Sequence, residues 1–300
     1  MNQPPLIDIV DAHHHLWDLK LNKHSWLTGE IEKGHLGDYT PICQDYLPTI
    51  FLNESKKYNI KKSVHIQAGW DRADPVGETK WLQDMASTSG YPTAIVFYVD
   101  FLAPDYIKTI EANIARSNVR GVRQIINYDP NPYYSGCGID YLSNPQWQKN
   151  TSILAKYKLS FDMQIYPEQV DAAYQLIKAN TNITFIIGHL CMPKFRTAEY
   201  FKDWQNSVAK LCSLDNVYMK LSGFGMFEPG WTVDSIKPFI DAAISAFGIN
   251  RCMFASNYPV DKLYKSYDDI FDSYLAVVNN YSQDEIKHLF QTNAERAYRI

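Results

Sequence analysis

Short apolar runs recur along the whole chain, separated by longer stretches of mixed polarity. Each run is rich in β-branched or aromatic residues and too short for a helix, which predicts buried strands. The eight predicted strands are Ile7–Ala12, Ser63–Ala68, Ala94–Val99, Val119–Ile126, Leu159–Ile165, Ile183–Gly188, Val217–Leu221 and Cys252–Ala255.

The stretches between these runs have the apolar spacing of helices that cover a sheet. Residues Asp105–Ser117 and Glu168–Ala179 are two examples, with apolar positions three or four apart. Strands that alternate with helices are parallel and joined by right-handed crossovers. Eight such units in 300 residues predict an α/β fold, a single (β/α)8 TIM barrel domain spanning residues 1–300.

Two of the predicted connections are long. Residues Asp18–Pro48 follow the first strand and residues Asp129–Pro145 follow the fourth, and both are rich in Tyr, Asn, Gly and Pro. In a barrel, the loops after strands lie on the catalytic face. We therefore expect both loops to cover a substrate.

Composition narrows the range of partners. The chain has 29 basic and 33 acidic residues, a formal net charge of −4, and no basic block that would follow a phosphate backbone. We expect a small-molecule substrate and neither nucleic acid nor a membrane as partner. The N-terminal residues lack an export signal, which favours a cytoplasmic protein. The sequence leaves the oligomeric state open, a homodimer being one option.

Three histidines stand at predicted strand ends. His13 and His15 end the first strand, where residues two apart point to the same side, and His189 ends the sixth. His14 should face the opposite side. Because all strands of a barrel end at one rim, the three imidazoles should be neighbours and could share one divalent ion, zinc first among them. A polar strand end or a satisfied core histidine is the alternative for each.

Four further polar residues fall on the same predicted rim. Arg123 is a candidate anchor for a substrate carboxylate or carbonyl, with Arg120 as its competitor. Gln67 and Gln164 could orient substrate hydroxyl groups or simply fill the barrel. Lys220 lies between apolar residues, so we expect a buried ion pair before a role in binding substrate.

Several motifs together resemble a known family, the amidohydrolase-related TIM-barrel proteins that include L-fuconolactone, L-rhamnonolactone and 2-pyrone-4,6-dicarboxylate lactonases. The resemblance covers nearly the whole chain. The motifs are Asp11-x-His13-x-His15-x-Trp17, the segment from Val119 to Gln124, the segment from Gly188 to Pro193, the segment from Val217 to Gly223, the segment from Ala255 to Val260, and the closing segment from Asn293 to Arg296. The resemblance implies that His13, His15 and His189 form the active site, with or without a metal.

One position departs from the family pattern. The resemblance implies a catalytic aspartate after the eighth strand, and this chain has Asn257 there. A carboxamide cannot accept a proton near neutral pH, so the usual base is missing. A metal-bound hydroxide or a relocated base could replace it; Asp261 is the first candidate, followed by Asp71 and Asp100.

These observations predict a hydrolase that opens a lactone of a sugar acid or small carboxylate, with His189, Asn257 and Asp261 as its catalytic residues. The neutral Asn257 keeps two alternatives open. One is a barrel that binds a small molecule without hydrolysing it, and the other is a decarboxylase.

Overall fold

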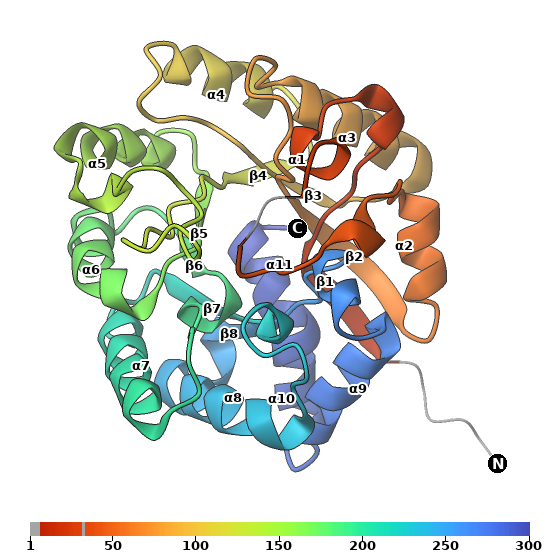
Figure 1. The fold of residues 1–300 in the computed structure, drawn as a ribbon, viewed down its shortest axis with the longest axis vertical. Coiled ribbons are helices and arrows are strands. Elements are labelled where there is room, and N and C mark those ends of the chain that lie inside the picture. The colour runs from red at the N-terminus through yellow and green to blue at the C-terminus, as the bar shows by residue number, and fades with distance from the viewer. Residues whose placement is uncertain (1–6, 32–33) are drawn as a thin grey trace.

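Eight parallel strands form one nearly closed barrel in this computed structural model, which describes residues 7–31 and 34–300 (Figure 1). Neighbouring strands in the chain are neighbours in the sheet, from first to last. The strands are β1 (Asp8–His14), β2 (Asn59–Ile66), β3 (Ala94–Phe97), β4 (Val119–Val122), β5 (Ser160–Met163), β6 (Phe185–Ile187), β7 (Val217–Leu221) and β8 (Cys252–Phe254). The predicted TIM barrel is confirmed.

The barrel closes through the segment that follows β8. The backbone N–H of His15 donates to the carbonyl of Tyr258 at 2.7 Å, and the N–H of Asn257 donates to the carbonyl of His13 at 2.8 Å. Closure therefore occurs at the same level as the predicted histidine site.

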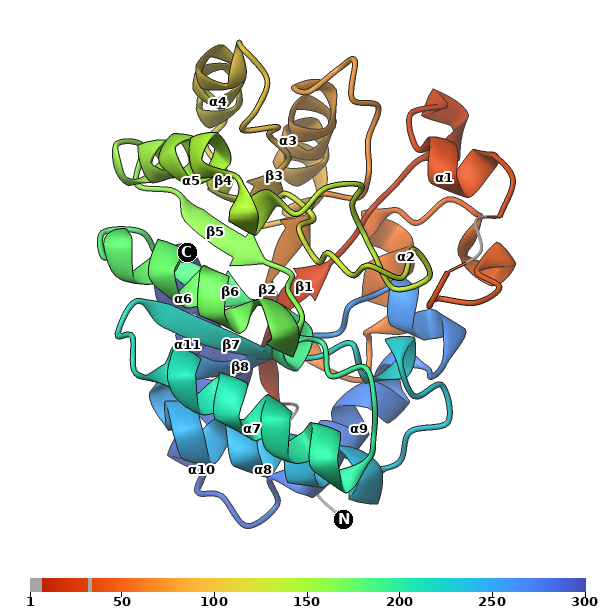
Figure 2. The same ribbon diagram turned by 60° about the vertical axis from the view of Figure 1, so that its left-hand side comes forward.

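Most helices surround the strands as an outer ring, whereas Asn293–Tyr298 lies across one end of the barrel (Figures 1 and 2). The helices are α1 (Ser25–Thr28), α2 (Pro48–Glu54), α3 (Gly77–Ser89), α4 (Tyr106–Ile114), α5 (Pro145–Thr151), α6 (Val170–Ala179), α7 (Ala198–Cys212), α8 (Val233–Phe247), α9 (Tyr267–Val277), α10 (Gln283–Lys287) and α11 (Asn293–Tyr298). None of the helices in the described ranges is long and apolar enough to span a lipid bilayer.

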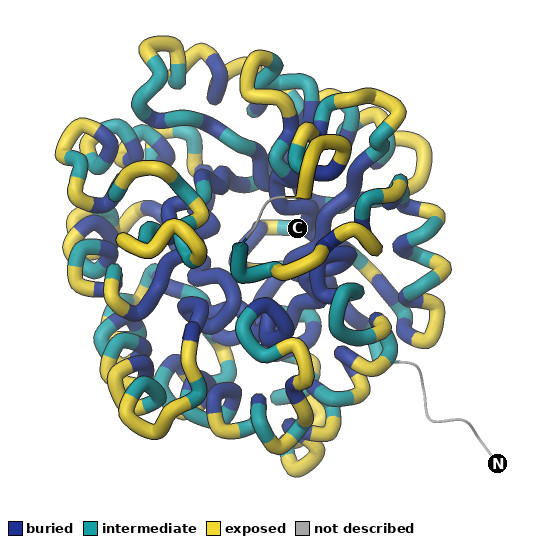
Figure 3. The backbone as a smooth tube through the Cα atoms, viewed as in Figure 1, coloured by how far each residue is buried: buried dark blue, intermediate teal, exposed yellow. Residues whose placement is uncertain are grey.

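Burial follows this arrangement: the strands are buried and the outward faces of the helices are exposed (Figure 3). A separate apolar cluster fills the barrel itself, formed by small and β-branched side chains such as Val10, Val64 and Val96 together with Tyr298 of α11. Because α11 packs against this cluster, one end of the barrel is closed and the other is left for a site.

A register irregularity in β1 sets the direction of the histidines. Val10 and Ala12 belong to the cluster inside the barrel, so regular alternation would point His13 outward. The pairing of β1 with β2 shifts between Asp11 and His14, however, and an extra residue at such a bulge reverses the alternation. His14 consequently stacks outside the barrel on Phe51, at 4.5 Å between ring centroids, as expected for the residue between the two site histidines.

Candidate active site

A cavity of about 910 Å³ opens at the C-terminal ends of the strands. Its lining includes His15, His189 and Asn257, together with Arg123 and Gln164. Both long loops contribute to its walls, as predicted, although residues 32 and 33 of the first loop lie outside the described residues. The aromatic side chains of the wall are Trp26, Tyr39, Trp70 and Tyr133.

The three predicted histidines meet beneath this cavity. The Nε2 atoms of His13 and His15 are 3.3 Å apart, and the rings of His13 and His189 are 4.6 Å apart between centroids. Burial lowers the pKa of all three well below the usual 6.5, and the positive charge of Lys220 adds to the effect at His13 and His189. The imidazoles are therefore neutral at physiological pH.

His189 sits on a strained turn. Four consecutive residues, His189 to Met192, have φ between 46° and 58°, the left-handed region. This conformation costs a non-glycine residue roughly 1–2 kcal/mol, and such strain is concentrated at functional sites. The turn directs the ring toward β7, where Nδ1 lies 2.9 Å from the Ser222 hydroxyl.

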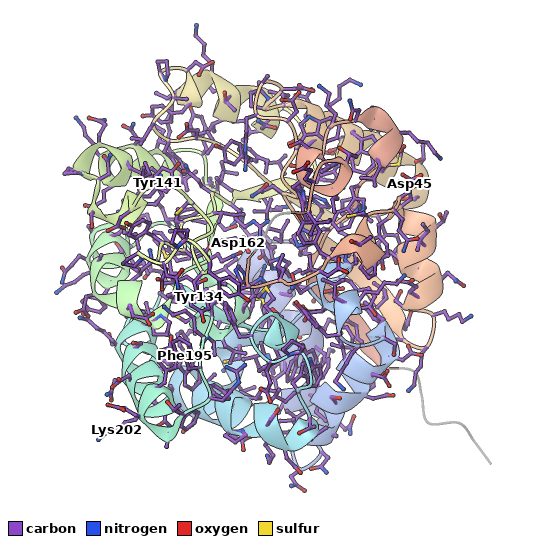
Figure 4. All side chains as sticks on the ribbon, viewed as in Figure 1. Asp45, Tyr134, Tyr141, Asp162, Phe195 and Lys202 are labelled. Atoms are coloured by element: carbon purple, nitrogen blue, oxygen red, sulfur yellow. The ribbon has the colours of Figure 1, made fainter. Side chains whose placement is uncertain are left out.

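A buried ion pair supports His13 from below. The Lys220 ammonium is 2.6 Å from the Asp162 carboxylate and 3.3 Å from Nδ1 of His13. Tyr298 donates a hydrogen bond to the same Asp162 oxygen at 2.6 Å. Asp162 lies near the middle of the barrel (Figure 4). Lys220 thus forms the expected ion pair, and it is not among the described residues that line the cavity.

This pair determines whether the three histidines fit a shared metal ion. A ligand histidine coordinates through one nitrogen and normally donates its other N–H to an acceptor. His15 meets this requirement, because its Nδ1 lies 2.7 Å from the carbonyl of Ile66. His13 differs, because the group 3.3 Å from its Nδ1 is the Lys220 amine and not a carbonyl or carboxylate acceptor. Within residues 7–31 and 34–300, no three His, Cys, Asp or Glu side chains are arranged so that they could hold a metal ion. The three histidines as placed therefore do not fit a shared ion.

Arg123 and Gln164 lie together on the cavity wall, whereas Gln67 and Arg120 do not. Arg123 donates to Gln164 Oε1 at 3.3 Å and to the backbone carbonyl of Gln67 at 2.5 Å. The Gln67 side chain accepts from the N–H of Gly69 instead, and is absent from the described cavity lining. Arg120 bonds to the carbonyl of Arg299 beside α11, at the closed end of the barrel.

Asn257 and Asp261 form a buried pair at the edge of the cavity. Asn257 has a left-handed φ of 56°, and its Nδ2 donates to Asp261 Oδ1 at 2.9 Å. Burial raises the Asp261 pKa to about 7, opposed by hydrogen bonds from Asn257 and from the backbone of Gly223. Asn257 lines the cavity and Asp261 lies behind it, absent from the described lining. Asp261 therefore positions the Asn257 carboxamide, and Oδ1 of Asn257 remains able to accept a hydrogen bond.

The other two candidate bases are engaged elsewhere. Asp71 lies at the cavity wall, where a hydrogen bond from the backbone N–H of Ala73 lowers its pKa, helped by the Lys23 ammonium at 3.2 Å. Asp100 accepts a backbone hydrogen bond from Leu102 at 2.9 Å.

Some site residues were absent from the sequence prediction. Asp162 could have been noticed, because a single acidic residue in an apolar strand indicates a buried charge that needs a partner. Its partners Lys220 and Tyr298 could not be identified, because they are distant in the chain. Arg72 lies in the cavity wall after β2. Nothing in the sequence indicated this position, because the sequence of a loop does not show where its side chains point.

Comparison with known proteins places this site in a family. The sequence profile of the amidohydrolase family Amidohydro_2 matches residues 10–300, so the chain belongs to this family of hydrolytic enzymes. The chain is 37% identical to the uncharacterized protein y4mH of Sinorhizobium fredii over 98% of this chain and 99% of that protein. It is 24% identical to the L-fucono-1,5-lactonase of Burkholderia ambifaria over 97% and 95% of the two chains.

The fold comparison agrees. An amidohydrolase from Burkholderia multivorans, solved with bound zinc, superposes with a TM-score of 0.81 at 20% identity and covers 98% of this chain and 100% of that one. At this identity the likeness shows the fold, and the predicted family resemblance is confirmed by the profile match.

Proposed function

We propose that this protein hydrolyses a lactone of a sugar acid or small carboxylate by direct attack of water. The observation that carries the proposal is the convergence of His189, Arg123 and Asn257 on one cavity, above the buried Lys220–Asp162 ion pair. Lactonase relatives of similar length support the choice of a cyclic ester.

The cationic groups suit the negative charge that develops on the carbonyl oxygen during attack. Arg123 faces the cavity and its buried Nε has no hydrogen-bond partner. Lys220 adds a second positive charge below His13. The Asp162 carboxylate is paired with Lys220, so Arg123 and Lys220 together leave one positive charge in excess. Fixed positive charge in a water-poor site stabilises an oxyanion without reorganisation, a contribution typically worth 10²–10³ in rate per donor.

His189 is the group best placed to take the proton from water. If Nδ1 donates to Ser222, the lone pair of Nε2 remains for the cavity, and Oδ1 of Asn257 can orient the water. Water adds to the carbonyl carbon and its proton passes to His189. The ring C–O bond then breaks and the same proton moves to the leaving oxygen, giving the open-chain hydroxy acid. This step uses the protein's own side chains, with Lys220 lying 3.3 Å from Nδ1 of His13.

The test compares His189→Gln with His288→Gln, a histidine outside the cavity lining, on a panel of γ- and δ-lactones. Acid release is followed with a pH indicator. We expect kcat to fall by about 10²–10⁴ in the first variant and to be unchanged in the second. Failure of the unmodified protein to hydrolyse any lactone contradicts the proposal.

A barrel that binds a lactone or hydroxy acid without hydrolysing it is the second candidate. Asn257 favours it, because the carboxylate behind it does not reach the cavity lining. Tight binding of a hydroxy acid together with the absence of turnover on the same panel would select this function.

A further inference from the structure

The cavity carries more uncompensated positive charge than a neutral sugar ring requires. Arg72 and Arg123 both line it. The acidic member of the described lining is Asp71, and its carboxylate is 3.2 Å from Lys23. Lys23 also lies 3.3 Å from Asp74. Two acids stand against Lys23, so once Arg72 and Arg123 are included the three cations exceed these two acids by one charge.

Arg72 is held in place by an aromatic ring, and the nearby acid is Glu78, whose pKa burial raises and the Arg72 charge lowers. Arg72 is exposed on the loop after β2, and its guanidinium carbon lies 3.4 Å from the centroid of the Tyr98 ring. Across residues 7–31 and 34–300, no carboxylate forms an ion pair with it. Stacking on an aromatic face fixes the plane of the guanidinium and leaves its N–H edge free for a planar anion.

Arg123 adds a second charge deeper in the cavity. Its two hydrogen-bond partners are neutral, the Gln67 carbonyl and the Gln164 carboxamide. Burial lowers its pKa to about 10, against the opposing effect of Asp162 and Glu78, so the group stays cationic at neutral pH. Glu78 compensates only in part, because burial raises its own pKa to about 7.

We propose that Arg72 is a specificity determinant that selects a lactone bearing a second, ionised carboxylate. Arg123 faces the reacting carbonyl, and Arg72 at the entrance binds the distal carboxylate. The inference rests on the proposed lactone hydrolysis and narrows its substrate class. The inferred substrate differs from the L-fucono-1,5-lactone named for two relatives, since that lactone has no free carboxylate.

A matched pair of substrates tests the inference. D-glucaro-1,4-lactone and D-glucono-1,4-lactone differ only at C6, a carboxylate in the first and a hydroxymethyl group in the second. We expect kcat/KM to favour the first, and the ratio to fall roughly ten- to a hundredfold in Arg72→Gln, the range for a lost hydrogen-bonded ion pair. Arg72→Lys should keep part of the ratio. Arg296→Gln, an exposed arginine on α11 outside the described cavity lining, should keep all of it. An equal ratio in the unmodified protein and Arg72→Gln overturns the inference.

Binding separates this inference from the proposed reaction. Calorimetric titration with D-glucarate and D-gluconate, the open-chain acids, requires no turnover. Preference for glucarate that is lost in Arg72→Gln supports the inference even when neither lactone is hydrolysed, a result that contradicts only the proposed hydrolysis. No binding of either acid, or tighter binding of 6-phosphogluconate than of glucarate, overturns the carboxylate assignment.

Discussion

Replacing Asp261 by asparagine is expected to remove a pH dependence from the stability of the barrel. The Asp261 carboxyl is buried, and burial raises its pKa from the usual 3.8 to about 7. Its hydrogen bond with Asn257 can persist in the variant, because an asparagine Oδ1 also accepts from Nδ2 at this position. The substitution therefore removes the titration and keeps the contact.

The raised pKa of Asp261 makes the free energy of unfolding depend on pH, because the folded and unfolded states bind this proton differently. The folded state holds the Asp261 proton up to about pH 7, whereas the unfolded chain releases it near 3.8. The contribution of the bound proton to the free energy of unfolding is fully present below pH 3.8, the pKa in the unfolded chain. It is lost as the pH rises through about 7, the pKa in the folded state. Between about pH 5 and pH 8 the loss amounts to roughly 2–3 kcal/mol.

Urea unfolding of both proteins at about pH 5, 6.5 and 8 measures the effect. The free energy of unfolding of the unmodified protein, minus that of Asp261→Asn, should fall by about 2–3 kcal/mol across the series. Taking the difference cancels the titration of all other groups. A difference that stays constant within about 0.5 kcal/mol would refute the assignment of a near-neutral pKa to Asp261.

Three further predictions concern the surrounding groups. Asn257→Asp sets two carboxylates against each other and should lower the unfolding free energy at about pH 8 by roughly 1–3 kcal/mol; Asn257→Asp with Asp261→Asn should recover most of it, and no recovery would contradict the pairing. Lys220→Met leaves the buried Asp162 carboxylate without its cation and with the Tyr298 hydrogen bond, at a cost of about 3–5 kcal/mol in urea unfolding, and the double variant with Asp162→Asn should be milder; equal costs would count against the ion pair. Dialysis against a chelator, checked by elemental analysis, should leave kcat within about twofold because Lys220 opposes metal ligation by His13, and loss of activity restored by zinc would show that the histidines rearrange around an ion.

Much of the barrel could be predicted because each strand carries its own apolar pattern. The predicted strand Val217–Leu221 matches β7, whereas Val119–Ile126 extends beyond β4, which ends at Val122. The segment continues beyond β4 as isolated backbone contacts, Arg123 with Phe97 and Ile125 with Gln164, and Arg123 and Ile125 line the cavity there. An apolar pattern in the sequence indicates that residues are buried. It does not show whether they belong to a hydrogen-bonded strand or to the wall of a cavity.

The site was predictable only where a residue ends a strand. His13, His15 and His189 could be placed at one rim because a barrel brings all its strand ends together. The bulge in β1 was not predictable, since the pairing with β2 depends on residues about fifty positions away. Arg72 lies in a loop, whose direction is set by tertiary contacts such as the Tyr98 ring.

The contact between Tyr298 and Asp162 has a consequence for how the enzyme matures during synthesis. Asp162 holds Lys220, which meets His13, so the active-site floor depends on a residue in α11, the last helix of the barrel. A ribosome-bound chain that still lacks α11 can assemble most strands but leaves this carboxylate without its phenol partner. Competence for catalysis should therefore appear only after α11 has left the ribosome.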